Sequence, residues 1–135
     1  MSTRTRKPKA LSLKDAFETE FARREMERRA REDAERAQQA ADLGGAKALH
    51  DAVTADGAFL QTRGLSADLR RYTVSLDHKN FRIAAYFEGG KASVTLSDKR
   101  TTAPGSAAPR KQETVESVED ALAVMAQFLA DETPK

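Results

Sequence analysis

Three short runs of the chain alternate apolar and polar residues between positions 72 and 97. The apolar positions are Tyr72, Val74 and Leu76 in the first run, Phe81, Ile83, Ala85 and Phe87 in the second, and Ala92, Val94 and Leu96 in the third. Because successive side chains leave a strand on opposite sides, this period predicts strands with one apolar and one wet face. Gly89 and Gly90 supply the positive φ angles of a tight hairpin turn between the last two runs. The pattern predicts a three-stranded antiparallel meander.

A helical period of apolar residues follows near the C-terminus. Its stripe consists of Val118, Leu122, Met125 and Leu129, widened by Ala121, Val124 and Phe128. Ser117 followed by Asp120 fits a capping box at the start of such a helix. A stripe of this width is suited to cover the apolar face of the meander, which needs a covering layer.

A long charged helix is predicted from Leu13 to about residue 43. Ser12 and Asp15 fit a capping box at its start, and Gly44–Gly45 predicts its end, because glycine readily takes the left-handed conformation that terminates helices. Its one apolar stripe recurs every four residues and comprises Leu13, Phe17 and Phe21. Further along, the stripe is reduced to alanines, and acids lie four residues before bases, so we expect helix propensity and charge pairs to hold this part.

The remaining segments are predicted to be a second helix, a turn and a loop, which together with the elements above form one domain. A second helix is predicted from Ala46, either ending at Asp56–Gly57 or continuing to Gly64, and we favour the longer version. Residues 65–69 are predicted as a connecting turn and the proline- and glycine-bearing segment 101–112 as a mobile loop. We therefore expect an α+β fold: a three-stranded antiparallel β-meander packed against a C-terminal helix and a preceding helix, with a long N-terminal charged helix. The expected division is a disordered basic tail 1–11, a charged amphipathic helix 12–44 and an α+β domain 46–131.

Charge is segregated along the chain although the net charge is only +2. The sheet region 63–111 is predominantly basic, whereas the segment 112–135 is acidic. Two interpretations remain open: the two segments pack together and partly neutralise each other, or the wet face of the sheet meets an anionic partner.

The residue content argues against an enzyme. Cysteine is absent, only His50 and His78 are present, and no serine or glycine set forms a nucleophile elbow or a phosphate loop. His78 falls in a predicted turn, and His50 and Asp51 are neighbours on a helix, where adjacent side chains point about 100° apart. We expect no catalytic residue, no metal and no cofactor. No apolar run approaches the length of a membrane span, so we expect a cytoplasmic protein that does not bind membranes.

The function predicted from these features is non-enzymatic binding of a macromolecule, as an adaptor or regulatory module. Leu13, Phe17 and Phe21 on an otherwise charged helix are typical of an amphipathic helix that docks on a protein partner. The competing interpretation is that the same three residues cover the domain's own sheet. The pattern leaves the oligomeric state and the identity of the partner open.

Nucleic-acid binding is the alternative function. The residues that would carry it are Arg4, Arg6, Lys7 and Lys9 in the tail and Arg71 and Arg82 on the outer face of the sheet. The order helix, three strands, helix is similar to that of double-stranded-RNA-binding domains. That family places lysines at the start of its last helix, where this chain has Glu119 and Asp120.

Overall fold

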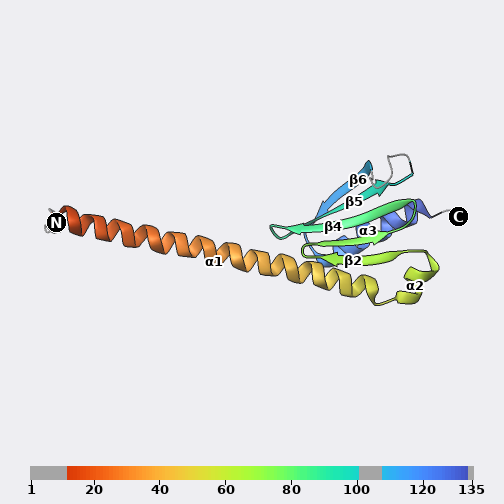
Figure 1. Ribbon diagram of the computed structural model, residues 1–135, viewed down its shortest axis with the longest axis horizontal. Coiled ribbons are helices and arrows are strands. Elements are labelled where there is room, and N and C mark those ends of the chain that lie inside the picture. Colours follow the sequence, from red (N-terminus) through yellow and green to blue (C-terminus); the bar gives the residue numbers. More distant parts are fainter. Residues whose placement is uncertain (1–11, 101–107, 134–135) are drawn as a thin grey trace. The chain divides into compact units, whose positions relative to one another are not determined.

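The computed structural model describes residues 12–100 and 108–133, and it is an α+β structure (Figure 1). Its elements in chain order are α1 (Leu13–Thr54), α2 (Gly57–Thr62), β2 (Ser66–Arg70), β3 (Thr73–Asp77), β4 (Phe81–Glu88), β5 (Lys91–Asp98), β6 (Ala108–Val115) and α3 (Val118–Glu132). The chain divides into two compact units, Met1–Ala37 and Gln38–Lys135, and α1 contributes residues to both. The predicted tail 1–11 and most of the predicted loop, residues 101–107, lie outside the described residues.

The sheet is an antiparallel meander of five strands in the order β2-β3-β4-β5-β6. Its three middle strands are those predicted from the alternation, and the predicted inward residues within them are buried, Val74, Ile83 and Val94 completely. The prediction was wrong for Tyr72, which precedes β3 and is only half-buried. Gly89 and Gly90 form the turn between β4 and β5 with φ angles of +61° and +80°, as expected for a hairpin. The predicted number of strands was wrong, because one further strand lies on each edge.

The first additional strand, β2, occupies residues predicted to form a connecting turn. It pairs with β3 along its whole length, Ala67 opposite Leu76 and Leu69 opposite Val74. Ala67 and Leu69 are only half-buried, and the other three residues of the strand are exposed. A short edge strand with two modest apolar residues carries too little alternation to be separated from a turn by sequence alone.

The second additional strand, β6, includes the end of the segment predicted as a loop. On its inward side, Lys111 and Glu113 lie opposite Leu96 and Val94 of β5, in positions where apolar residues would be expected. The ammonium group of Lys111 lies 5.8 Å from the ring centre of Phe128 and pairs with Asp131 at 2.6 Å. The aliphatic part of the lysine side chain thus covers apolar surface, while its ammonium group remains paired with Asp131. Because a lysine takes the place of an apolar residue, the sequence of β6 does not show the alternation of a half-buried strand.

Helix α1 passes through Gly44–Gly45 without a break, so the predicted helix end was wrong. Beyond the glycines, Ala46, Leu49 and Val53 are buried in the core. Two glycines inside a helix cost about 1 kcal/mol each relative to alanine, which the burial of the following apolar residues outweighs. The favoured longer second helix was also wrong: α1 ends at Thr54, and a separate α2 begins at Gly57.

Helix α3 confirms the predicted C-terminal helix, but its buried face is shifted from the predicted stripe, since Leu122 is 38% exposed. Ser117 caps it by accepting a hydrogen bond from the backbone N–H of Asp120 at 3.0 Å. Its buried residues Ala121, Val124, Met125 and Phe128 face β4, β5 and β6. Together with the C-terminal turns of α1, α3 closes the core on one side of the sheet.

Candidate protein-binding site

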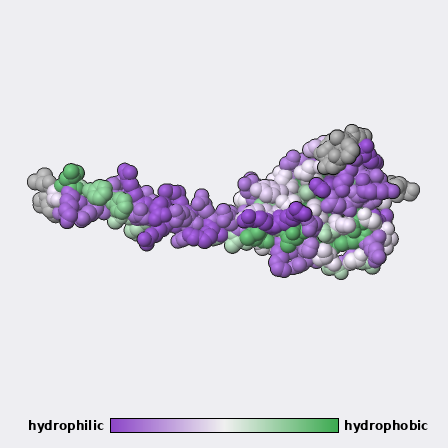
Figure 2. Space-filling view, viewed as in Figure 1, coloured by the Kyte–Doolittle hydropathy of each residue, from purple (hydrophilic) through white to green (hydrophobic). Residues whose placement is uncertain are grey.

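The three predicted anchor residues form an exposed apolar stripe near the start of α1, here called the Phe stripe: Leu13, Phe17 and Phe21. Their exposed fractions are 85%, 60% and 53%, and Figure 2 shows hydrophobic residues gathered at this end of the helix. The rings of Phe17 and Phe21 stack on each other with centres 5.6 Å apart and planes at 26°. The predicted cap is present, since the hydroxyl of Ser12 accepts from the N–H of Asp15 at 3.2 Å. The stripe is therefore held by a regular, capped helix.

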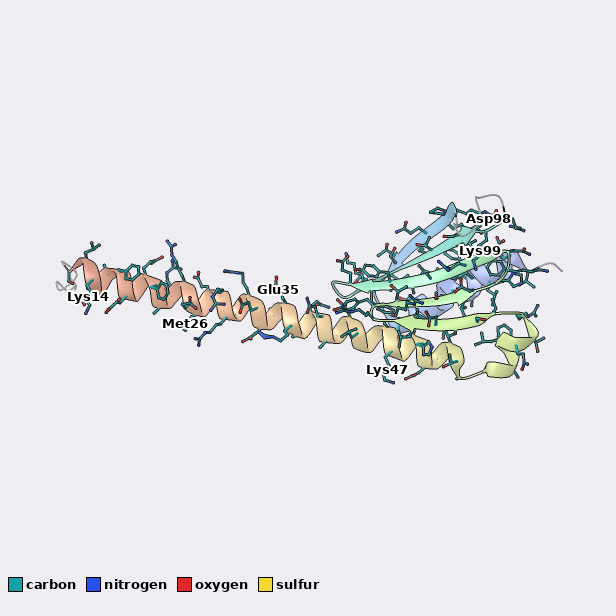
Figure 3. The ribbon with its side chains drawn as sticks, viewed as in Figure 1. Lys14, Met26, Glu35, Lys47, Asp98 and Lys99 are labelled. Carbon is teal, nitrogen blue, oxygen red and sulfur yellow. The ribbon has the colours of Figure 1, made fainter. Side chains whose placement is uncertain are left out.

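Charged side chains along this part of α1 pair with one another. Arg23 and Arg24 bind Glu20, and Arg28 bridges Glu25 and Glu32 at 2.6 and 2.7 Å. The hydrogen bond from Arg23, followed by that from Arg24, lowers the pKa of Glu20 to about 2. These pairs are solvent-exposed and local, so they stabilise the helix weakly. The Phe stripe is the main apolar feature of this part of the helix, and Met26, labelled in Figure 3, is exposed elsewhere on it.

Arg71 and Arg82, the two residues of the nucleic-acid alternative that the structure describes, lie near opposite ends of β3. Arg71 lies in the turn between β2 and β3 with φ of +53°, and its guanidinium is 5.5 Å from the ring centre of Tyr72. Arg82 lies near the other end of β3, where it pairs with Asp77 at 2.6 Å. The four tail residues, Arg4, Arg6, Lys7 and Lys9, lie outside the described part of the chain.

Basic residues around the end of β5 have acidic partners instead. Arg100 binds Asp98 at 3.0 Å and Glu132 at 3.5 Å, and Arg110 binds Glu132 at 3.2 Å. The backbone and side chain of Arg100 lower the pKa of Asp98. The acidic C-terminal segment thus packs beside the basic sheet region and partly neutralises it, which agrees with the first of the two interpretations of the charge pattern.

A second ion cluster lies across the strands at the same end of the sheet, where Figure 3 labels Asp98 and Lys99. Asp77 accepts from Arg82 at 2.6 Å and from Lys99 at 2.9 Å. Burial alone would raise the pKa of Asp77, but these two hydrogen bonds outweigh it, and the pKa is lowered. The cluster joins β3 to β4 and to the residue that follows β5.

A buried carboxylate, Asp42, was missed by the sequence analysis. Only 6% exposed, it accepts from the N–H of Gly89 at 2.9 Å and from the N–H of Gly90 at 3.0 Å. Its 4-3-4 spacing to Ala46, Leu49 and Val53 places it on the buried stripe of α1, a signal that was available in the sequence. The carboxylate fixes the β4–β5 turn against the helix.

No known protein family, curated protein or solved structure matches the chain. Within residues 12–100 and 108–133, no group of three or more acidic, histidine or cysteine side chains is placed to hold a metal ion. In the same described ranges, no helix combines the length and the apolar character needed to cross a membrane.

Proposed function

We propose that this chain is a non-enzymatic adaptor or regulatory module that binds a protein partner through the Phe stripe. The observation that supports the proposal most is the exposure of two stacked phenylalanines on a capped, regular helix. An amphipathic helix of this kind binds by placing residues spaced by three or four positions into an apolar groove. Aromatic residues supply most of the binding energy of such interfaces because each buries a large apolar area.

The competing role of the Phe stripe, covering the domain's own sheet, receives less support. The apolar face of the sheet already packs against Ala46, Leu49 and Val53 of α1 and against the buried residues of α3. These residues all belong to the unit Gln38–Lys135. The domain core is therefore complete without Leu13, Phe17 or Phe21.

The experiment is a comparative capture with three baits: the full chain, the double variant Phe17→Ala/Phe21→Ala, and Met26→Ala. Met26 is a matched control, because it is 72% exposed on the same helix and lies outside the stripe. Each bait is used with and without nuclease, and retained proteins are quantified by isotope-labelled mass spectrometry. We expect a protein retained by the full chain and by Met26→Ala to be lost with the double variant, whatever the nuclease treatment.

Thermal melting of the three baits separates binding from folding. Exposed substitutions usually change the free energy of unfolding by less than about 0.5 kcal/mol, so the midpoints should agree within about 3 °C. A much lower midpoint for the double variant would assign the stripe to the core and overturn the proposal. Material that is retained only without nuclease would favour the nucleic-acid alternative, and equal retention by all three baits would place the binding site elsewhere.

A further inference from the structure

An apolar cavity lies between the end of α1, α2 and α3. Its volume is about 490 Å³, and Val53, Leu60, Leu76 and Met125 are the buried residues that line it. Phe59 of α2 and Leu122 of α3, 42% and 38% exposed, also line it. Small-molecule sites are typically cavities of about 300 to 1,000 Å³ with mainly apolar walls. This cavity falls in the lower half of that range and belongs entirely to the unit Gln38–Lys135.

A polar cavity of about 360 Å³ adjoins the apolar one and shares Arg63, Leu129 and Thr133 with it. His78 and Asn80 lie in its wall, and the backbone N–H of Asn80 donates to Nδ1 of His78 at 3.1 Å. With Nδ1 acting as an acceptor, the neutral ring carries its proton on Nε2 and is a hydrogen-bond donor there. The two cavities therefore place an apolar wall next to a wall that carries hydrogen-bond donors.

Among the charged residues that line the polar cavity, Arg100 and Glu132 form ion pairs, whereas Arg63 has none in the described residues. Arg100 and Arg110 share Glu132, and Arg100 also binds Asp98, so these two bases and two acids compensate each other. Arg63 lies 5.7 Å from the centre of the Phe59 ring and has no carboxylate within 4 Å in the described residues. Asp56 also lines the apolar cavity, and its carboxylate caps α2 by accepting from the N–H of Phe59 at 3.1 Å. One guanidinium without an ion pair in the described residues is thus positioned where the apolar and polar cavities meet.

We propose that these joined cavities bind a monocarboxylate with a medium-length aliphatic chain. The chain occupies the apolar cavity, and the carboxylate pairs with Arg63. A planar guanidinium matches a carboxylate through two parallel hydrogen bonds, and a single positive charge balances a single negative one. A doubly charged phosphate would leave excess negative charge beside Glu132. The volume of the apolar cavity is large enough for such a chain.

The test titrates three small molecules into the full chain by calorimetry, below their aggregation limits: decanoate, decanol and acetate. Decanol has the aliphatic chain without the charge, and acetate has the charge without the chain. We expect saturable 1:1 binding of decanoate, about tenfold weaker binding of decanol, and no detectable binding of acetate, because a hydrogen-bonded ion pair at a cavity mouth contributes about a factor of ten or more.

Two variants with matched controls locate the site. Arg63→Gln should weaken decanoate about tenfold and leave decanol unchanged, whereas Arg31→Gln, a change at an exposed arginine of α1, should change neither. Ala126→Leu fills the apolar cavity from α3 and should weaken both ligands about tenfold. Ala123→Leu makes the same change at an exposed position of α3 outside the cavity wall and should have no effect.

The competing occupant is the N-terminal part of α1, with its Phe stripe, from a second copy of the chain. A synthetic peptide of residues 12–26 tests this, since it carries the Phe stripe. Binding of the peptide that Ala126→Leu abolishes, without saturable decanoate binding, would assign the cavity to that helix and overturn the proposal. Decanoate affinity unchanged by both Arg63→Gln and Ala126→Leu would also overturn it. The Phe17→Ala/Phe21→Ala variant should bind decanoate like the wild type, so this proposal and the adaptor proposal can fail separately.

Discussion

Replacing Asp42 by alanine tests how the β4–β5 turn is held against α1. The carboxylate accepts two backbone N–H groups, from Gly89 and Gly90, and the side-chain amide of Gln38 at 3.1 Å. A hydrogen bond to a charged group contributes about 1.5 to 3 kcal/mol when its donor has no other partner. Both glycines are exposed, so water replaces part of each lost bond. We therefore take the low end for each backbone bond and expect Asp42→Ala to lower the free energy of unfolding by about 3 kcal/mol.

That loss is a large part of the total stability, since domains of this kind are stable by about 5 to 15 kcal/mol. Urea unfolding followed by circular dichroism measures it as a shift of the midpoint at constant slope. Asp42→Asn keeps the size of the side chain but places an amide –NH₂ opposite one of the N–H donors. This variant should recover less than half of the loss.

The matched control is Asp51→Ala, a substitution of the same kind in the same helix. Asp51 is exposed and pairs only with Lys47, at 3.4 Å, within the described residues. Its replacement should change the free energy of unfolding by no more than about 0.5 kcal/mol. If Asp42→Ala costs as little as Asp51→Ala, the two backbone bonds do not hold the turn, and the reasoning fails.

Two further predictions concern pH and packing. The pKa of Asp77 is lower in the folded chain than its unfolded value of about 3.9, so its contribution is present above that pH and lost as the pH falls through the folded pKa. Asp77→Asn should therefore cost about 1 kcal/mol in urea unfolding at pH 7 and less at pH 3, and an equal cost at both would contradict this. Gly44→Ala should stabilise the chain by about 0.5 to 1 kcal/mol. Gly45→Ala should lack that gain, because its Cβ would lie 3.0 Å from the Phe87 ring; equal midpoints in thermal melting would refute the difference.

The predictable parts of the fold are those where one residue pattern repeats long enough to dominate. Strands β4 and β5 have eight residues each, and their alternation is nearly uninterrupted, so both strands and their buried faces were found. The two edge strands were missed for different reasons. Strand β2 has no fully buried apolar residue, only the half-buried Ala67 and Leu69, and β6 places Lys111 on its inward side. The predicted helix end at Gly44–Gly45 was wrong because the cost of each glycine in a helix, about 1 kcal/mol, is outweighed by the burial of apolar residues further along the helix. That burial depends on the fold and is not visible in the local sequence.

The candidate sites were predictable from the sequence only where their residues are close together in the chain. The Phe stripe was predictable because its residues are neighbours on one helix. Whether it is exposed could be decided only from the structure, in which other residues form the core. The Asp42 contact joins residues 47 and 48 positions apart, and the joined cavities are lined by residues of α1, α2, β3, β4 and α3. An unpaired arginine such as Arg63 has no distinctive local pattern. It becomes a candidate only when the fold places it where the two cavities meet and shows that Glu132 is bound to Arg100 and Arg110 while Asp56 caps α2.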